Sequence, residues 1–286
     1  MPKRISEKPA VFLKLFKARY DPAAKTLRDP LVSLREVKSA LGTMAAAGET
    51  KLSDANAANF IKDYLRSSTR SANWPPEILA AGYTAKQRTG EGQCFEFVAL
   101  APGEDPFPDD FLPTGDEPTF IAQTLSLPVT TRDIVRKDEQ SVAQIAVKLH
   151  VLEHFLASSP KANGWGVREI THLQNNVKLS SSEIDSLYQV VAHTDRGTEI
   201  GAVAVEVKIG DPIIAEQIEK QALAILQDES FAFCIPAILK RFKKGELIAM
   251  HLDPVRREDV QTDGTLHLGA IAYSARYVFA PPLPKI

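Results

Sequence analysis

Hydrophobic and polar positions along the C-terminal half switch between helical and strand periods, and this pattern predicts its elements in order. A long helix is expected at 139–157, because apolar residues recur there at helical spacing until glycines intervene at Gly164 and Gly166. The pattern after those glycines predicts strands at 167–173, 184–192 and 200–208 with a turn at 194–197, a helix at 213–226, a buried strand at 231–239, and strands at 246–252 and 268–279.

The first hundred residues predict short helices followed by a hairpin. The second helix is expected to end at Gly42, and Ser53 and Asp54 are expected to cap the third. The hairpin turn is the polar, glycine-containing segment 89–92. These signals place helices at 11–19, 33–42 and 55–65 and hairpin strands at 83–88 and 93–100.

Three small helices and a terminal two-stranded wing are typical of a winged-helix module, whose third helix enters a DNA groove. The same elements also suit a small helical domain with a structural or protein-docking role. If the module binds DNA, the candidate contacts are polar residues of the third helix and the wing, namely Asn56, Asn59, Lys62, Arg66, Lys86 and Arg88.

Charge is distributed unevenly along the 286 residues, although the whole chain carries only -2. Residues 1–100 hold 16 Lys and Arg against 10 Asp and Glu, whereas residues 101–130 hold 6 acids and no base. This distribution indicates a polyanionic partner for the first module, or merely a solvated basic surface. We expect a domain at 1–100, an acidic, proline-rich linker at 101–130, and a second domain at 131–286.

Only two cysteines occur, Cys94 and Cys234, and they lie far apart. This spacing argues against a disulfide framework and against a cysteine-based zinc site, and it suits a reducing compartment. The N-terminus has no apolar signal core, and no apolar run has the roughly 20 residues that span a bilayer. We therefore expect a cytoplasmic protein without a membrane partner.

The candidate chemistry lies on two successive expected strands. Asp185 falls on one, and Glu206 and Lys208 share a face of the next, because side chains alternate with period two. Two acids and a lysine at one sheet edge suit metal-assisted hydrolysis of a phosphodiester. Glu-x-Lys triplets on exposed strands also form cross-strand ion pairs, and this structural alternative remains open.

The Asp185…Glu206-Val207-Lys208 pattern, set in the order helix, three strands, helix, strand, resembles the PD-(D/E)XK nuclease superfamily, which includes most type II restriction endonucleases. The resemblance covers residues 139–240, and the strings at 174–178 and 183–188 are also similar to bacterial restriction-type enzymes. Ile184 stands where many members have proline. The implied fold class is α+β: a winged-helix-like module joined to an αβββαβ core with a central mixed sheet.

The resemblance also implies roles. Asp185 and Glu206 would hold one or two Mg²⁺ ions with the backbone carbonyl of Val207, and Lys208 would orient the attacking water. Some relatives use an upstream helical glutamate, which makes Glu153 an accessory candidate. Further candidates for contacts with the scissile phosphate, the site or DNA are Gln174, Lys178, Gln217 and Lys220, and surface or loop roles remain open for all five.

The resulting hypothesis is a homodimeric, Mg²⁺-dependent endonuclease that cuts double-stranded DNA in bacterial restriction. The homodimer follows from the two-fold symmetry of palindromic sites. A repair or recombination nuclease on the same core remains open. So does a winged-helix regulator without catalytic activity.

A rival constellation lies on the long expected helix. His150, Glu153 and His154 fit the H-x-x-E-H pattern of inverted zinc peptidases, in which two histidines one turn apart share a zinc ion. Such a site needs a further acidic ligand downstream, and the candidates are Glu216, Glu219 and Glu229. The element order after Gly166 disfavours this alternative.

Overall fold

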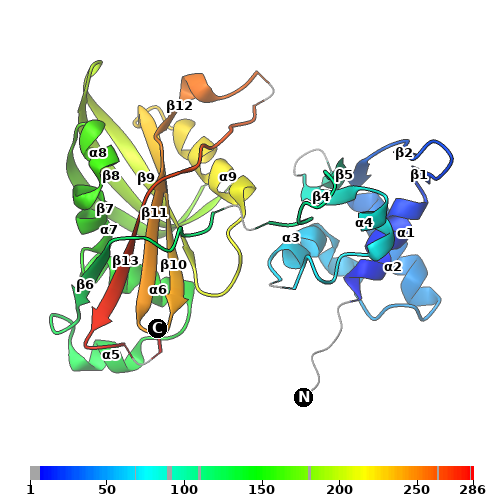
Figure 1. Cartoon of the computed structure of the whole chain (residues 1–286), viewed down its shortest axis with the longest axis horizontal. Coiled ribbons are helices and arrows are strands. Elements are labelled where there is room, and N and C mark those ends of the chain that lie inside the picture. The colour runs from blue at the N-terminus through cyan, green and yellow to red at the C-terminus, as the bar shows by residue number, and fades with distance from the viewer. Residues whose placement is uncertain are drawn as a thin grey trace. The chain divides into compact units, whose positions relative to one another are not determined.

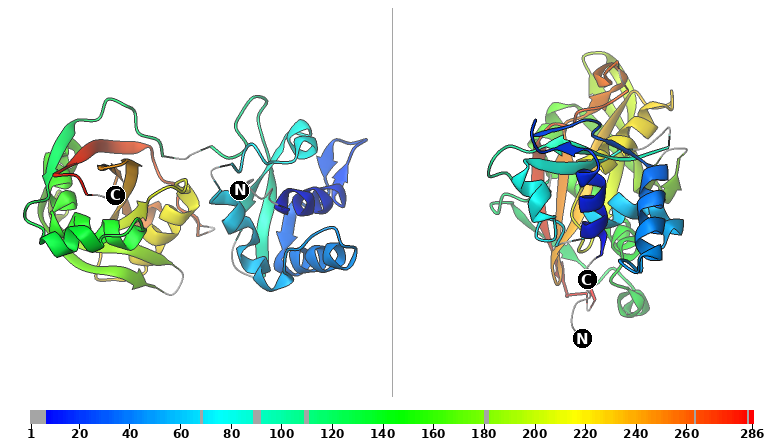
Figure 2. Two further views of the ribbon diagram at one scale, coloured as in Figure 1. Left: turned by 90° about the horizontal axis from the view of Figure 1, so that it is seen from below. Right: turned by 90° about the vertical axis from the view of Figure 1, so that its right-hand side faces the viewer.

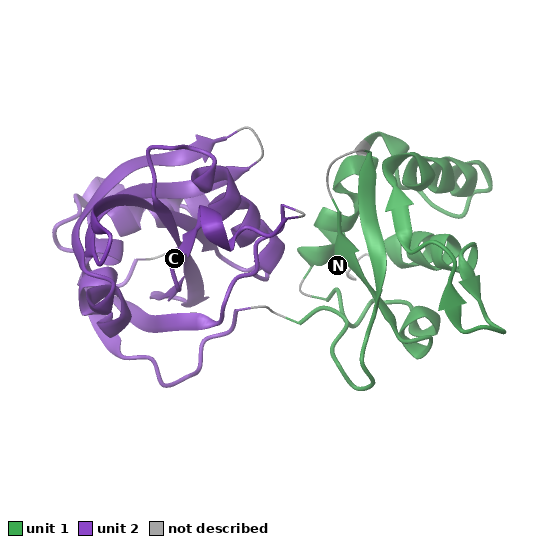
Figure 3. Ribbon diagram, turned by 90° about the horizontal axis from the view of Figure 1, so that it is seen from above, with its two compact units in different colours: residues 1–109 green, residues 110–286 purple. Residues whose placement is uncertain are grey.

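The structure is a computed structural model that describes residues 7–67, 69–88, 92–108, 111–179, 182–262, 264–283 and 285–286. The chain divides into two compact units, residues 1–109 and 110–286 (Figure 3). The segment 101–130, expected as a linker, is not only a linker, because it contains strand β6 (Thr119–Gln123), which joins the sheet of the second unit. Both units mix helices and strands, so the α+β class is confirmed.

The first unit is built around an aromatic core. The ring of Phe12 lies 4.8–5.2 Å, centroid to centroid, from the rings of Phe60, Tyr64, Trp74 and Phe95. The elements around this core are α1 (Lys8–Lys17), β1 (Tyr20–Asp21), β2 (Thr26–Leu27), β3 (Leu31–Ser33), α2 (Leu34–Ala46), η1 (Asp54–Asn59), α3 (Phe60–Leu65), α4 (Pro76–Ala80), β4 (Tyr83–Gln87) and β5 (Gln93–Ala99).

Two helix predictions in this unit were wrong in extent. Helix α2 begins with a capping box between Ser33 and Glu36, but it continues through Gly42 to Ala46. The third expected helix consists of the 3₁₀ helix η1 followed by the six-residue α3. Its first half contains two asparagines, which favour local side-chain bonds over a regular α-helix.

The predicted hairpin is confirmed, since β4 and β5 pair antiparallel. The sequence pattern did not indicate a third strand, β3, which pairs with the other edge of β5. The sheet order is therefore β3-β5-β4. Strands β1 and β2 form a separate two-stranded ribbon.

The second unit contains one large, strongly curled mixed sheet (Figures 1 and 2). Its strand order is β6-β13-β11-β10-β9-β8-β7, and β12 pairs with β10. Strand β10 runs parallel to β9, and β6 runs parallel to β13. The remaining elements are α5 (Val129–Ile134), α6 (Glu139–Lys148), α7 (Val151–Ser158), α8 (Pro160–Gly164), β7 (Val167–Lys178), β8 (Glu183–Thr194), β9 (Gly197–Lys208), α9 (Ala215–Leu226), β10 (Phe233–Lys243), β11 (Glu246–Leu252), β12 (Val255–Arg256), η2 (Arg257–Asp259) and β13 (Ile271–Ala280).

Helices cover both faces of this sheet, and strand β9 shows why. Its Val203, Val205 and Val207 pack against α6 and α7 on one face. Its Ala202 and Ala204 pack against α9 on the other face. Because both faces of β9 are buried, its sequence is nearly continuously apolar, and polar residues within it need partners.

The long helix expected at 139–157 is two helices. Helix α6 ends at Lys148, and α7 begins after His150, whose backbone is left-handed at φ 52°. No glycine or proline marks this break, so the apolar period alone made the two helices look continuous. Within the described ranges, no helix is both long enough and apolar enough to cross a membrane.

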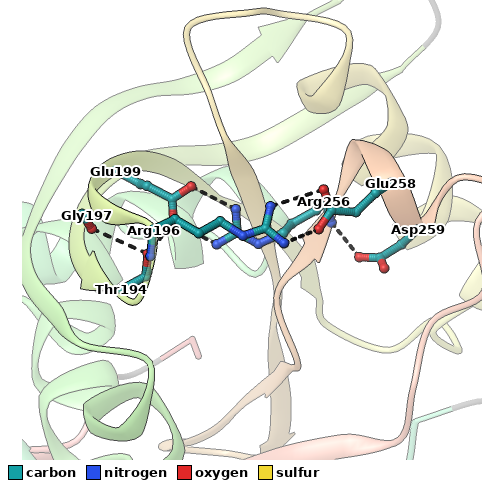
Figure 4. A network of polar contacts seen from close by, with 7 residues as sticks. All are labelled: Thr194, Arg196, Gly197, Glu199, Arg256, Glu258 and Asp259. Carbon is teal, nitrogen blue, oxygen red and sulfur yellow. Dashed lines mark hydrogen bonds and ion pairs between the residues drawn. The ribbon is translucent and has the colours of Figure 1, made fainter.

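An arginine–carboxylate network fastens the β8–β9 turn to the segment after β12 (Figure 4). The Arg256 guanidinium donates two hydrogen bonds of 2.9 and 2.8 Å to the Glu199 carboxylate, which also accepts one of 2.6 Å from Thr194 Oγ1. Arg196 pairs with Glu258 beside it. The Arg256 and Thr194 bonds hold the pKa of the Glu199 carboxyl down at about 2.

We expect Glu199→Gln to lower the free energy of unfolding of the second unit by about 1 kcal/mol at neutral pH. The folded-state pKa of about 2 lies below the unfolded value of 4.5, so this stabilisation is complete above pH 4.5 and is lost as the pH falls toward 2. Urea unfolding of both proteins at about pH 7 and pH 3 measures the difference. Glu258→Gln is the matched control, with a smaller effect, because that side chain is 55% exposed. Equal losses at both pH values would contradict the prediction.

Candidate active site

The predicted acids meet where the ladder between β8 and β9 ends. The last paired residues there are Ser186 and Val205, so Asp185 and Glu206 are the next residues of the two strands. Beyond this point, the Val207 N–H donates a 2.7 Å hydrogen bond to Asp185 Oδ2 in place of a backbone partner on β8. The Asp185 side chain therefore holds β9 at the place where the two strands part.

Glu206 is almost completely buried, with 1% of its surface exposed. Two amides of α9 hold its carboxylate, since Gln217 Nε2 and Gln221 Nε2 each donate a 2.5 Å hydrogen bond. Gln221 Nε2 also bonds the carbonyl of Glu183 at 2.9 Å, which ties α9 to the start of β8. The carboxylate orientation is thus fixed by the helix that follows its own strand.

Lys208 is 5% exposed and forms an ion pair with Glu206. Its Nζ also lies 3.5 Å from Oε1 of Glu139, the first residue of α6. Asp138 caps this helix by accepting a 2.7 Å hydrogen bond from the Ser141 N–H, which fixes where α6 begins. The site therefore draws side chains from two strands and from helices on both faces of the sheet.

The electrostatics of the site are dominated by buried carboxylates. Burial, together with the neighbouring Glu206 charge, raises the pKa of the Asp185 carboxyl to about 7. Burial also raises the pKa of Glu206, although Lys208 opposes it. Burial would lower the pKa of Lys208, but the ion pair with Glu206 and the charges of Glu139 and Asp185 together outweigh it, and this pKa is raised. Asp185, Glu206 and Glu139 against one ammonium leave a formal charge of -2 when all are ionised.

This donor set fits a divalent cation. Carboxylate oxygens are the ligands that Mg²⁺ prefers, and Mg²⁺ retains several waters, so a pair of acids is sufficient. Gln221 Oε1 is buried beside Glu206, and no donor among the described residues reaches it. The Val207 carbonyl points toward β8 like its N–H, because the two groups of one strand residue face the same side. Within the described part of the chain, no three His, Cys, Asp or Glu side chains converge as a metal-binding group.

The implied accessory residues divide into those near the site and those elsewhere. Gln217 contacts Glu206 directly, and Lys220 lies half-buried one turn further along α9. Gln174 and Lys178 are exposed on β7, and Lys178 is paired in register with Glu183. Glu153 is not in the site, because it lies on α7 beside His150, at 3.2 Å from its Nδ1.

Sequence reasoning missed Glu139 and Gln221. Glu139 was interpreted only as the start of a long helix, although its place after the Asp138 cap marked it as a first-turn acid. Gln221 follows Gln217 by four residues, which places both amides on one face of α9. That spacing was the available signal.

His150 and Glu153 are in contact, but the structure does not bring the two histidines and a downstream acid together. His150 is 77% exposed, whereas His154 turns to the Tyr277 hydroxyl at 2.8 Å. Their helix α7 packs on one face of the sheet, whereas α9, which carries Glu216 and Glu219, packs on the other. The sheet thus separates the two groups.

The candidate DNA contacts of the first unit lie on η1, α3 and β4 and just after α3 and β4. Asn59 and Lys62 belong to η1 and α3, Arg66 follows α3, and Lys86 is exposed on β4. Arg88 pairs with Glu96 at 2.8 Å. The side chain of Asn56 lies outside the described residues.

Comparison with protein-family models, with curated proteins and with solved structures finds no match for this chain.

We expect Asp185→Asn to stabilise the metal-free protein at about pH 8 by roughly 1–3 kcal/mol. The folded-state pKa of about 7 lies above the unfolded value of 3.8, so folded Asp185 retains a proton between these values that the unfolded chain has released. The wild type therefore loses stability as pH rises from about 4 to 7, and the variant, whose amide oxygen still accepts from Val207, does not. Calorimetric Tm values across this range in EDTA measure it. Asp195→Asn, at an exposed turn, serves as the control and should retain the wild-type slope.

Proposed function

We propose that this chain is a Mg²⁺-dependent endonuclease that hydrolyses phosphodiester bonds of double-stranded DNA. The observation that carries the proposal is the meeting of Asp185, Glu206 and Lys208 where strands β8 and β9 part. Glu206 and Lys208 follow Asp185 by 21 and 23 positions in the chain, so it is the fold that brings them together and not their proximity in sequence. A buried ion pair would need only one acid, whereas this site holds three acids and one lysine.

The excess negative charge is what distinguishes the site from a structural ion pair. Buried like charges are unfavourable unless a cation offsets them, and Mg²⁺ held by Asp185 and Glu206 supplies that charge. When bound, the ion would polarise the phosphate and lower the pKa of an attacking water. Lys208 places a positive charge beside the two acids, where it can stabilise negative charge on the phosphate oxygens.

The surrounding residues act by positioning. Gln217 and Gln221 hold the two Glu206 oxygens, and the Val207 N–H holds one Asp185 oxygen. The second Asp185 oxygen stays available as a ligand. Because α9 fixes Glu206 before a ligand binds, little reorganisation is needed at the moment of reaction.

The order of elements supports the same assignment. Helix α6, followed by the short helices α7 and α8, precedes strands β7, β8 and β9, and helix α9 and strand β10 come next. The three strands form an antiparallel meander, and the last strand returns parallel to β9. This is the αβββαβ order implied by the resemblance to PD-(D/E)XK nucleases, and we assign the second unit to that class of nuclease on this basis.

We assign the first unit to DNA engagement. Its helices α1 and α2 are separated by strands β1, β2 and β3, and the short helices lead into the β4–β5 hairpin. Strand β5 lies between β3 and β4, an arrangement that suits a winged helix. Restriction is the context that the resemblance favours, and a repair or recombination role would use the same chemistry.

We expect Asp185→Asn, Glu206→Gln and Lys208→Met each to reduce Mg²⁺-dependent cleavage of plasmid DNA by about 10³-fold. Each change removes a charge from the site while keeping a side chain of similar size. Nicking of supercoiled plasmid in Mg²⁺, with EDTA as the blank, measures the rate. His150→Ala and Glu153→Gln are matched controls and should cut within about twofold of the wild type.

Circular dichroism must show that the inactive variants are folded, because Glu206 and Lys208 are buried. Asp185→Asn is the decisive variant, since it keeps its bond to Val207 and is expected to be more stable than the wild type. Wild-type activity in this variant would sink the nuclease assignment. Loss of activity in His150→Ala would instead favour a metal site on α7.

We expect Lys62→Ala/Lys86→Ala to weaken binding of the full chain to a DNA duplex by at least about tenfold in Mg²⁺-free buffer. Two lost phosphate contacts should also reduce the slope of log affinity against log salt by about 1.8. Fluorescence anisotropy at several salt concentrations measures both quantities. Lys17→Ala/Lys25→Ala removes the same charge from exposed positions of the same unit and should change neither. Equal effects of the two pairs would contradict a specific DNA face.

A further inference from the structure

A row of paired residues, most of them cationic, crosses the large sheet and starts at Lys208 of the candidate site. The Cα partner of Lys208 on β10 is Lys240, Lys240 is paired with Ile248 on β11, and Ile248 is paired with Arg276 on β13. Paired residues of neighbouring strands point to the same face, so these side chains share the face that carries Glu206 and Lys208. Ile248 is buried in the middle of the row, whereas Lys240 and Arg276 are partly exposed.

A β-bulge lies at the end of β10 nearest this row. The register between β10 and β11 shifts between Arg241 and Lys243, so Phe242 is an extra residue without a partner on β11. Its side chain is 50% exposed, and the Arg276 guanidinium lies over its ring at 5.0 Å from the centroid. Bulges often redirect a side chain beside an active site, and here the bulge presents an aromatic ring to solvent.

The charge around Phe242 is positive. Lys243 and Lys244 are both exposed at the tip of the β10–β11 hairpin. Two acids accompany these cations: Glu246 lies 3.1 Å from Lys243, and Glu117 lies 3.5 Å from Arg276. Lys243 and Arg276 are each paired with one of these acids, and the exposed Lys244 adds a further positive charge at the tip.

We propose that the hairpin tip, defined as Phe242, Lys243, Lys244 and Arg276, holds the DNA backbone beside the cleaved bond. The proposal rests on the nuclease function proposed above and adds the surface that positions the substrate. The cations contact successive phosphates, and the Phe242 ring contacts a sugar or base. Exposed aromatic rings interleaved with Lys and Arg are the chemistry by which proteins bind nucleic-acid strands.

The dimensions of this surface match a DNA strand. Neighbouring strands of a sheet lie about 4.8 Å apart, so Arg276 is about 14 Å from Lys208 across three strands. Lys243 is three residues beyond Lys240, or about 10 Å along β10. Phosphates of one DNA strand rise about 3.4 Å each along the helix axis and also rotate around it, so a surface of these dimensions reaches more than one phosphate beyond the site.

The experiment compares DNA cleavage and DNA binding of full-length Lys243→Ala/Lys244→Ala with the wild type. We expect the KM for a DNA duplex to rise at least about tenfold with little change in kcat. The slope of log affinity against log salt should decrease in magnitude by about 1.8. Phe242→Ala should weaken binding severalfold without changing the salt slope, and Phe242→Trp should restore it. The matched control, Lys161→Ala/Arg168→Ala, removes two exposed cations, and Arg168 lies at the end of β7 remote from Asp185.

The outcomes separate this inference from the nuclease assignment. If the wild type cuts DNA but Lys243→Ala/Lys244→Ala leaves the KM and the salt slope unchanged, the DNA-binding role of the hairpin tip is overturned and the nuclease assignment stands. If the wild type does not cut DNA, but its binding to DNA without Mg²⁺ depends on Lys243 and Lys244, the nuclease assignment is overturned. The hairpin tip would then be a surface that binds a polyanion. Equal losses in the control pair would show that only total charge matters, which also overturns the inference. Thermal unfolding of each variant excludes loss of fold as the cause.

Discussion

The confinement of like charges is the constraint on which the second unit depends. Asp185 and Glu206 are held beside each other at the end of the β8–β9 ladder, and partial or complete burial raises the pKa of both carboxyls. Lys208 offsets one of these charges, and Glu139 adds another. Such an arrangement of like charges is unfavourable to folding, and the divalent cation that we propose would offset it.

The large sheet makes this confinement possible. Strands β9 and β10 are covered on both faces, so their ends can hold charged groups away from solvent without a separate pocket-forming domain. Helix α9 then contributes Gln217 and Gln221, while α6 contributes Glu139 from the other face. The arginine network at the opposite end of β8 and β9 fixes the far end of the same two strands.

The register of the strands connects the candidate active site with the surface of the β10–β11 hairpin. The pairing that places Lys208 beside Lys240 also places Arg276 in the same row, and the bulge at Phe242 ends that row with an exposed ring. A single register therefore links the proposed chemistry to the proposed grip on the substrate. A shift of one residue would turn every member of the row to the opposite face.

The sequence by itself determined most strands of the second unit, the helix α9 and the three residues of the candidate site, because period-two alternation and the Glu-x-Lys spacing are local properties. Asp185, Glu206 and Lys208 were identified in this way, and Gln217 was nominated with them. The sequence did not indicate β6 or β12. Only the tertiary structure decided that the helix at 139–157 breaks at His150, that Glu139 rather than Glu153 reaches the site, and that β6 joins β13. Those outcomes depend on contacts between residues far apart in the chain, and no local period records which distant element a side chain will meet.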